Sequence, residues 1–322
     1  MARYSHDQVQ QYLDYISVPV EERAFAYAGD PEERLQFLKR LIYFQLAKVP
    51  FENLSLHYSP DRTISMDIHH LFDKMVTRQN GRGGYCMEIN TFFASILRSL
   101  NFDVISVGGR ISNAMKPGGR ILDMSELEFG SWSHILNIVT VGRQRFFVDC
   151  GFGSNGPTLP VPLQDGFTCR NTGDSSGGTE LCLQRKHIPG NTHNTANQLL
   201  WIYNVRFDET GPWIPRYCFP ELEFLPNDFF AMNFFVSNSP TSWFTHKIVC
   251  MKFIVDHDTG TVLGEIALFE TVVKERRYGK SKTLMEIKSE ENRVEALRKY
   301  FNIKLSLPEI NGIKDVVTMI RQ

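Results

Sequence analysis

The chain has 322 residues, of which 42 % are apolar and 12 % aromatic, and its formal net charge is -1. This length exceeds what one small hydrophobic core serves, so we expect two or three packed subdomains. The balanced charge argues against a nucleic-acid partner held by bulk attraction, and no apolar run is long enough to predict a membrane partner. The first ten residues lack the apolar core of a signal peptide, so the predicted compartment is cytoplasmic.

The first hundred residues have the patterns of helices. The clearest pattern covers residues 31–46, with Asp30 as the N-cap and Pro31 in the first helical position. Further helices are expected at residues 7–13, near residues 67–75 and from residue 86 onward.

The pattern changes after residue 102, where β-branched and aromatic runs between turn residues predict strands. Residues 170–197 are rich in Gly, Ser, Thr and Asn and predict loops around short strands. Residues 226–233 predict a linker helix. The predicted strands cover 104–111, 135–141, 145–148, 199–206 and 249–255, and a turn at 258–261 and an amphipathic helix at 289–300 follow.

The six cysteines form no C-x-x-C pair and no metal-ligand spacing, so we expect neither a disulfide framework nor a metal site. Most of them are expected to be buried, unreactive thiols. Cys86 differs, because it follows two glycines and an aromatic residue at the start of a helical run. In the first turn of a helix, unpaired backbone N–H groups and the helix dipole favour the nucleophilic thiolate.

His134 and Asp149 lie on two predicted strands that a hairpin signal joins. A two-residue loop within residues 141–144 would pair residue 141 with residue 144 and make His134 and Asp149 diagonal neighbours on one face. A register slip of one residue would put them on opposite faces. In this arrangement His134 would take the thiol proton of Cys86, and Asp149 would orient the imidazole, as in other triads.

Each of these three residues has a structural interpretation when it is taken alone. The cysteine is then a buried thiol, the histidine a half-buried strand residue, and Asp149 a cap for the turn at Gly151. Together, on a helix and a hairpin, they favour a catalytic triad. Such a triad implies acyl transfer without naming the substrate, so a Cys-dependent hydrolase or transglutaminase-like enzyme and a non-catalytic relative stay open.

Five segments resemble motifs of the arylamine N-acetyltransferase family, and they span nearly the whole chain. P-F-E-N-L begins at Pro50, R-G-G-Y-C-M-E-I-N begins at Arg82, and S-P-T-S-W-F begins at Ser239. Between them come the Ser-His pair that ends at His134 and V-D-C-G-F-G, which begins at Val148. The motifs stand in the order that the family has.

The resemblance implies an α+β multi-domain fold with three parts. Residues 1–102 would be an N-terminal helical bundle that carries the nucleophilic cysteine, and residues 103–218 a central β-barrel that carries the histidine and the aspartate. Residues 219–322 would be a linker and a C-terminal α/β lid. The three parts would enclose a papain-like Cys-His-Asp catalytic core.

The resemblance also implies ping-pong chemistry without a metal. Acetyl-CoA would acylate Cys86, and a small aromatic amine, hydrazine or hydroxylamine would then accept the acetyl group. Detoxification of aromatic amines is the implied role. The stretch from residue 112 to residue 131 is longer than in compact family members and resembles fungal ones, some of which use malonyl-CoA. Malonyl-CoA is therefore the alternative donor, and Arg110 is a candidate partner for the malonyl carboxylate.

Carried over residue by residue, the resemblance gives catalytic roles to Cys86, His134 and Asp149. Ile111 and Phe152 match acceptor-pocket positions, with plain core packing as the alternative. The matched CoA contacts are Phe51, Ser131 in the turn before the histidine, Phe235 and Thr241. The alternatives are plain core packing for Phe51 and Phe235 and a turn for Thr241.

Three further features have weaker interpretations. Arg82 and Glu88 are expected to brace the cysteine loop through an ion pair or hydrogen bonds. The glycine-rich residues 151–156 are expected either to approach phosphates through backbone N–H groups or to form a flexible turn. Ser154 and Gly156 stand where some animal members have an arginine and a tyrosine, so the acceptor preferences of those members do not carry over.

Overall fold

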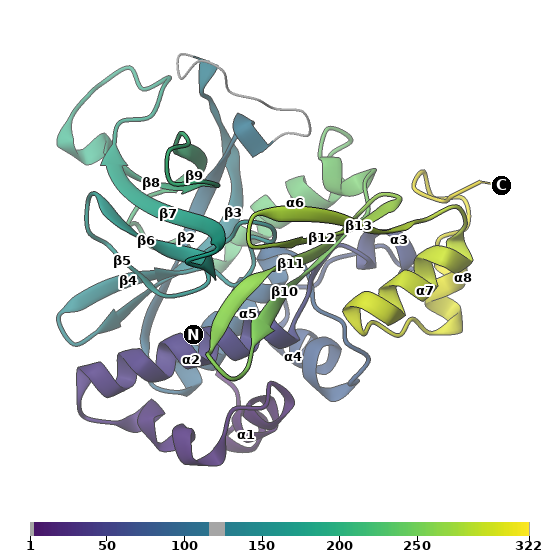
Figure 1. Cartoon of the computed structure of the whole chain (residues 1–322), viewed down its shortest axis with the longest axis horizontal. Helices are drawn as coiled ribbons and strands as arrows, with labels where there is room; N and C mark the ends of the chain where they lie inside the picture. Colours follow the sequence, from purple (N-terminus) through teal and green to yellow (C-terminus); the bar gives the residue numbers. More distant parts are fainter. Residues whose placement is uncertain (1–2, 116–125, 322) are drawn as a thin grey trace.

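The computed structural model describes residues 3–115 and 126–321. Two antiparallel sheets, one of eight strands and one of five, form the centre of the molecule. Figure 1 shows the first two helices at the bottom, the eight-stranded sheet at the upper left, and the last two helices at the right.

The N-terminal helices follow the sequence pattern closely. In the helix α2 (Pro31–Lys48), the side chain of Asp30 accepts a hydrogen bond from the N–H of Glu32, and Pro31 occupies the first turn, as predicted. The helix ends at Val49, directly before Pro50. The other elements of this region are α1 (His6–Tyr15), a 3₁₀ helix (Val20–Tyr27), α3 (Ser55–Tyr58), α4 (Ile68–Phe72), a π turn (Asp73–Thr77) and α5 (Cys86–Ser99).

The eight-stranded sheet has the order β5-β4-β3-β2-β9-β8-β7-β6 and curls into a nearly closed barrel. One apolar cluster fills its interior. The cluster contains side chains from strands at or near both edges of the sheet and from its middle, among them Val161, Leu181 and Tyr217. A 3₁₀ turn (Asn113–Met115) follows the second strand. The strands are β2 (Asp103–Ser112), β3 (Phe129–Val141), β4 (Gln144–Val148), β5 (Val161–Pro162), β6 (Phe167–Asp174), β7 (Gly177–Lys186), β8 (Leu200–Arg206) and β9 (Ile214–Phe219).

Residues 170–197 hold two strands and the loop after them, and the strands are longer than the short ones predicted. β6 and β7 form a regular hairpin, in which Thr172 and Thr179 face each other and their hydroxyl groups are 2.8 Å apart. β7 also places the side chains of Leu181 and Leu183 in the apolar cluster of the barrel. Backbone pairing, the cross-strand hydroxyl pair and these buried leucines together hold the hairpin.

The five-stranded sheet has the order β1-β10-β11-β12-β13 and joins distant parts of the chain. β1 (Phe51–Glu52) comes from the N-terminal region and pairs with β10. The division of the chain at residues 102 and 218 stays a prediction. The remaining elements are α6 (Pro226–Asn238), a 3₁₀ turn (Trp243–Thr245), β10 (Val249–Asp256), β11 (Thr261–Phe269), β12 (Val272–Arg277), β13 (Lys280–Glu286), α7 (Glu290–Phe301) and α8 (Leu307–Gly312).

The largest hydrophobic core lies between the layers. It combines side chains of α1, α2 and α5 with side chains of β3, β4, α6 and β10. A separate cluster packs the five-stranded sheet against α3 and α7. In the described part of the chain, no helix is both long and apolar enough to cross a bilayer.

Candidate active site

Cys86 is the first residue of α5 and is buried. The preceding residue, Tyr85, is the N-cap, and the Glu88 carboxylate accepts a hydrogen bond of 3.1 Å from its N–H. The thiol therefore stands where the helix dipole favours negative charge. The Cys86 Sγ lies 3.9 Å from the backbone oxygen of Ser133 on β3, so the helix start faces the strand that carries His134.

The hairpin of β3 and β4 brings His134 and Asp149 together. Val141 pairs with Gln144, and Asn137 pairs with Val148, which is the register that the two-residue loop predicts. Asp149 follows β4 directly, and its Oδ2 lies 2.7 Å from the Nε2 of His134. Both side chains are buried. Because Nε2 faces the carboxylate, Nδ1 is the ring nitrogen left to exchange a proton with the thiol.

The charge of Asp149 determines the protonation of His134. Burial alone would lower the pKa of the imidazole, but the Asp149 carboxylate, followed by the contact with Cys86, raises it to about 10. The imidazole is therefore protonated near neutral pH. The charged imidazole lies between the Cys86 thiol and the Asp149 carboxylate, which is the place of the proton-transferring residue in such a triad.

The second oxygen of Asp149 is held by Asn90, which sequence reasoning did not single out. The Asn90 Nδ2 donates to Asp149 Oδ1 at 2.8 Å and to the backbone oxygen of Ile135 at 2.6 Å. The Asn90 Oδ1 accepts from the N–H of Cys150 at 3.0 Å. Asn90 lies four residues after Cys86, so it shares the cysteine's face of the helix. That spacing is the signal that could have identified it.

Asp149 also caps the turn that follows it. Its Oδ1 accepts a hydrogen bond of 3.0 Å from the N–H of Gly151. A Cβ at Gly151 would lie 3.1 Å from the Cα of Cys86 and 2.8 Å from the Nδ2 of Asn90. Glycine is therefore needed here because the loop packs against the start of α5. The structural and the catalytic interpretations of Asp149 are compatible.

Aromatic rings surround the histidine. The Phe152 ring meets that of His134 edge-on, with 5.4 Å between centroids, and the Tyr217 ring lies 5.1 Å from it. Burial, followed by the charge of Asp149, raises the pKa of Tyr217 well above its usual range, so its hydroxyl stays neutral. That hydroxyl approaches Asp149 without the geometry of a hydrogen bond. Ile111 is paired directly with Tyr217 across β2 and β9.

The four predicted CoA contacts lie in different environments. Phe51 is buried in β1. Its ring packs so closely against Gly153 that a Cβ at that glycine would lie 3.1 Å from the ring. Ser131 is exposed and belongs to β3, so its prediction as a turn residue is wrong; the strand begins at Phe129, before the histidine segment. Phe235 on α6 and Thr241 after it are both exposed, away from the polar contacts of the triad.

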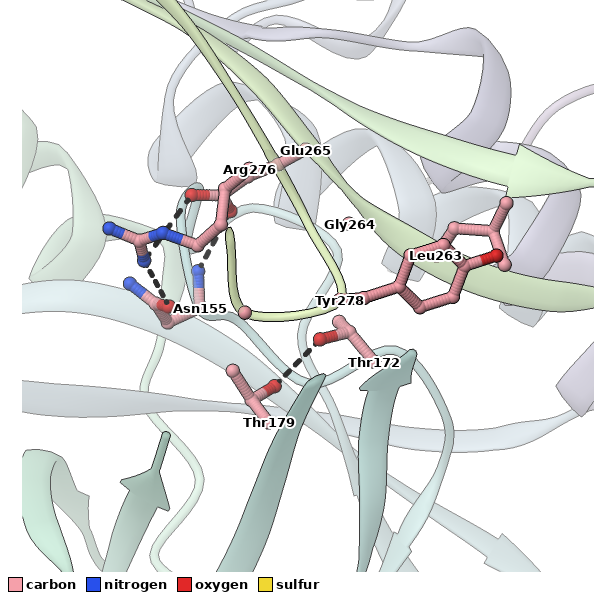
Figure 2. Close-up of a pocket in the computed structure, with 9 residues that line it drawn as sticks. Asn155, Thr172, Thr179, Leu263, Gly264, Glu265, Arg276 and Tyr278 are labelled. Atoms are coloured by element: carbon pink, nitrogen blue, oxygen red, sulfur yellow. Dashed lines mark hydrogen bonds and ion pairs between the residues drawn. The ribbon is translucent and has the colours of Figure 1, made fainter. Parts of the chain in front are cut away.

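The loop of residues 151–156 is fixed by the five-stranded sheet. Glu265 on β11 accepts a hydrogen bond of 3.3 Å from the N–H of Asn155, and Arg276 donates to Asn155 Oδ1 at 3.3 Å (Figure 2). The cavity beside these residues has a volume of about 10 Å³, which is the size of one water molecule. The carboxylate of Glu265 already occupies the N–H of Asn155, so this N–H is not open to a phosphate, and the two interpretations of the loop stay predictions.

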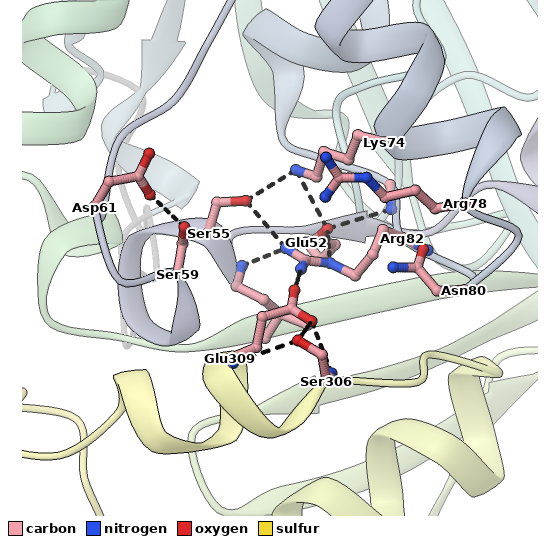
Figure 3. A network of polar contacts seen from close by, with 12 residues as sticks. Glu52, Ser55, Ser59, Asp61, Lys74, Arg78, Asn80, Arg82, Ser306 and Glu309 are labelled. Atoms are coloured by element: carbon pink, nitrogen blue, oxygen red, sulfur yellow. Dashed lines mark hydrogen bonds and ion pairs between the residues drawn. The ribbon is translucent and has the colours of Figure 1, made fainter.

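Four buried charges brace the cysteine loop, in a pairing that differs from the predicted one. Arg82 binds Glu52, with 3.0 Å between Nε and Oε1, and also contacts Glu309 at the start of α8 (Figure 3). Glu88 binds Lys74 instead of Arg82, with 2.7 Å between Nζ and Oε1. The sequence could not reveal this exchange of partners, because Glu52 and Lys74 reach the loop from other elements.

The two carboxylates of this network, Glu52 and Glu88, differ in the direction of their pKa shifts. Burial would raise the pKa of Glu52, but Arg82 and Lys74 hold it well below its usual range. Burial raises the pKa of Glu88 more than Lys74 lowers it. Glu52 is thus the firmly ionised member, and Lys74 lies within ion-pair distance of both carboxylates.

Asn53 connects the P-F-E-N-L segment with the S-P-T-S-W-F segment. Its Nδ2 donates to the backbone oxygens of Phe244 at 3.0 Å and Lys247 at 2.7 Å. The ring of Phe244 in turn lies 5.4 Å from that of Tyr85, next to Cys86. Phe244, rather than Thr241, is the residue of its motif that reaches the cysteine loop.

The other cysteines have no such surroundings. All six thiols are free, and burial raises the pKa of Cys150, Cys169, Cys182, Cys218 and Cys250. Within residues 3–115 and 126–321, no group of three or more His, Cys, Asp or Glu side chains is arranged to hold a metal ion.

This arrangement agrees with comparisons to known proteins. A family model described as N-acetyltransferase matches residues 34–310. The chain belongs to this family. It is 37 % identical over 325 residues to the N-malonyltransferase FDB2 of Fusarium pseudograminearum, a match that covers 97 % of this chain and 93 % of that protein. The resemblance to arylamine N-acetyltransferases that the motifs predict is confirmed, and the protein is an acyltransferase.

Two solved structures show the same fold. The arylamine N-acetyltransferase from Mycobacterium abscessus matches with a TM-score of 0.75 at 21 % identity, covering 98 % of this chain and 99 % of that one. The arylamine N-acetyltransferase of Mycobacterium marinum in complex with CoA gives a TM-score of 0.71 at 22 % identity, with 96 % and 99 % covered.

Proposed function

We propose that this acyltransferase works through a Cys86 thioester and takes its acyl group from acyl-CoA. The observation that carries the proposal is the buried contact of 2.7 Å between His134 and Asp149, beside a cysteine at the start of α5. Family membership supports the CoA donor, and so does the solved M. marinum relative in complex with CoA.

The first half-reaction would transfer the acyl group to the enzyme. The Cys86 thiolate attacks the carbonyl carbon of the CoA thioester, a new C–S bond forms, and the bond to the CoA sulfur breaks. The leaving CoA thiolate takes the proton from Nδ1 of His134. Asp149 keeps the imidazole oriented throughout and stabilises its charged form.

The second half-reaction would pass the acyl group to an amine. The neutral nitrogen of an aromatic amine, hydrazine or hydroxylamine attacks the thioester, and the Cys86 thiolate leaves. His134 takes the proton that the nitrogen loses, which restores the starting state. Phe152 and Ile111 are the proposed acceptor contacts, because one touches the His134 ring and the other faces Tyr217. An aromatic acceptor could stack on such a wall.

The donor is proposed as acetyl-CoA or malonyl-CoA. Malonyl-CoA gains support from the 37 % identity to an N-malonyltransferase, whereas the predicted Arg110 has other contacts. The Arg110 guanidinium stacks 4.0 Å from the Trp132 ring centroid and donates to the backbone oxygen of Gly130 at 2.9 Å. Phe51, Ser131, Phe235 and Thr241 remain proposed CoA contacts, and the cytoplasm remains the proposed compartment.

Intact-protein mass spectrometry after mixing with acetyl-CoA or malonyl-CoA, without an amine, tests this proposal. We expect an adduct of one acyl group on the wild type and none on Cys86→Ser. Five other free thiols serve as an internal control, because an adduct that survives in Cys86→Ser would lie on one of them. The absence of any adduct on the wild type would overturn the proposal.

A further inference from the structure

Arg216 is a buried arginine that has no carboxylate partner among residues 3–115 and 126–321. It lies on β9, and only 6 % of its surface is exposed. Its Nε has no hydrogen-bond partner among the described residues, and its one described acceptor is the thioether sulfur of Met115, 3.1 Å from the Arg216 nitrogen. A thioether is a weak acceptor. The other buried arginines, Arg82 and Arg293, each bind a glutamate.

A buried cation without a partner is costly, so its retention calls for a ligand. Burial lowers the pKa of Arg216 only to about 10, so the side chain still carries its charge at neutral pH. A guanidinium offers several N–H donors in a planar fork that fits a carboxylate.

Arg216 lies at a β-bulge between β8 and β9. Tyr203 pairs with Tyr217, but Asn204 pairs with Pro215, which leaves Arg216 as the extra residue of the bulge. A bulge re-aims a side chain and is common next to active sites. Tyr217, the next residue in the chain, contacts His134.

Arg216 lies next to the apolar cluster against which the two proposed acceptor-binding residues pack. Its guanidinium lies 5.2 Å from the ring centroid of Phe207. Phe207 packs against the barrel cluster together with Ile111 and Phe152. Arg216 therefore brings a positive charge to the edge of this cluster, where the Arg276 guanidinium also lies 5.5 Å from the Phe207 ring centroid.

The carboxylate of Glu265 does not neutralise this charge. Glu265 accepts the N–H of Asn155, and its Oε1 lies 4.0 Å from the NH1 of Arg276, as Figure 2 shows. Glu265 influences the pKa of Arg216, but no described carboxylate forms an ion pair with Arg216. Two guanidinium groups thus share one carboxylate, which leaves a positive charge to attract an anion.

We propose that Arg216 binds a substrate carboxylate, and that the malonyl group of the acyl donor supplies it. This inference rests on the proposed acyl transfer through Cys86. A malonyl group differs from an acetyl group by one carboxylate, which an apolar pocket rejects unless a buried cation pairs with it. An acceptor amine that carries a carboxylate is the other source of the same chemistry.

The test compares donors on Arg216→Gln and Arg216→Lys, with Arg298→Gln as the control, because Arg298 is an exposed arginine in the last turn of α7. Rates of adduct formation on Cys86 are measured by mass spectrometry with malonyl-CoA and with acetyl-CoA. We expect Arg216→Gln to lower the malonyl-to-acetyl rate ratio roughly 10- to 100-fold, the range of a hydrogen bond to a charged group. Arg216→Lys should recover part of the ratio, and Arg298→Gln should leave it unchanged.

A second arm locates the carboxylate. Acetylated wild type and Arg216→Gln are mixed with aniline or with 4-aminobenzoate, and discharge of the adduct is followed. A loss confined to 4-aminobenzoate supports a carboxylate site and assigns its source to the acceptor. Equal effects on both donors and both amines, or no effect, would overturn the proposal. A wild type that forms no adduct with either donor would instead overturn the acyl-transfer function.

Discussion

Substitution of Asn90 by alanine should weaken both the fold and the catalytic pair. The side chain makes three hydrogen bonds, to Asp149, to the oxygen of Ile135 and to the N–H of Cys150. Two neutral bonds contribute about 1 kcal/mol each, and the bond to a carboxylate contributes about 2 kcal/mol. We therefore expect Asn90→Ala to lower the free energy of unfolding by about 3–4 kcal/mol, because the partners stay buried and unsatisfied.

Urea denaturation followed by tryptophan fluorescence measures the loss of stability, and mass spectrometry measures the rate of Cys86 acylation. Asn311→Ala is the matched control, because Asn311 is an exposed asparagine on α8 and a surface change there costs at most about 0.5 kcal/mol. Acylation by Asn90→Ala should be at least about tenfold slower, since Asp149 loses a partner that fixes it. Wild-type stability together with wild-type acylation would refute the role given to Asn90.

Three further predictions concern the same region. Asp149→Asn should remove most acylation. It should also flatten the pH dependence of stability above neutral pH. The pKa of His134 is raised from 6.5 to about 10, so the contribution of its charged form to the free energy of unfolding is complete below pH 6.5 and is lost as the pH rises through about 10. Equal urea midpoints of wild type and variant at pH 7 and at pH 10 would contradict this. Gly151→Ala should slow acylation, because its Cβ would lie 3.1 Å from the Cα of Cys86; an unchanged rate would show that the loop shifts freely. Lys74→Met should destabilise the fold by about 3–5 kcal/mol by leaving Glu52 and Glu88 without their shared cation, whereas Glu88→Gln should cost less; the reverse order in thermal unfolding would contradict the assigned charges.

Local signals in the sequence predict much of the fold. The cap at Asp30, the hairpin at residues 141–144 and the helix at Cys86 each depend on neighbours within a few residues, and each is found as expected. The strands β6 and β7 are longer than predicted, because glycines and small polar residues form part of their length. The pairing of β1 with β10 was missed because strand pairing between distant segments leaves no local pattern.

The residues of the candidate site also divide into those that local sequence signals predict and those that depend on the tertiary fold. His134 and Asp149 could be brought together from the sequence because one tight hairpin joins them. Lys74 and Glu52 could not be assigned to the cysteine loop, since buried ion pairs between elements depend on the tertiary fold. No local pattern marks Arg216, because the bulge at this residue interrupts the strand alternation.

A single-turnover transfer tests the central claim most directly. The enzyme is acylated with acetyl-CoA or malonyl-CoA, freed of CoA by gel filtration, and mixed with an aromatic amine. The account predicts that the adduct on Cys86 disappears while one equivalent of the N-acyl amine forms. If the adduct is hydrolysed and no N-acyl amine appears, the protein is a thioester hydrolase and the proposed transfer to an amine is wrong.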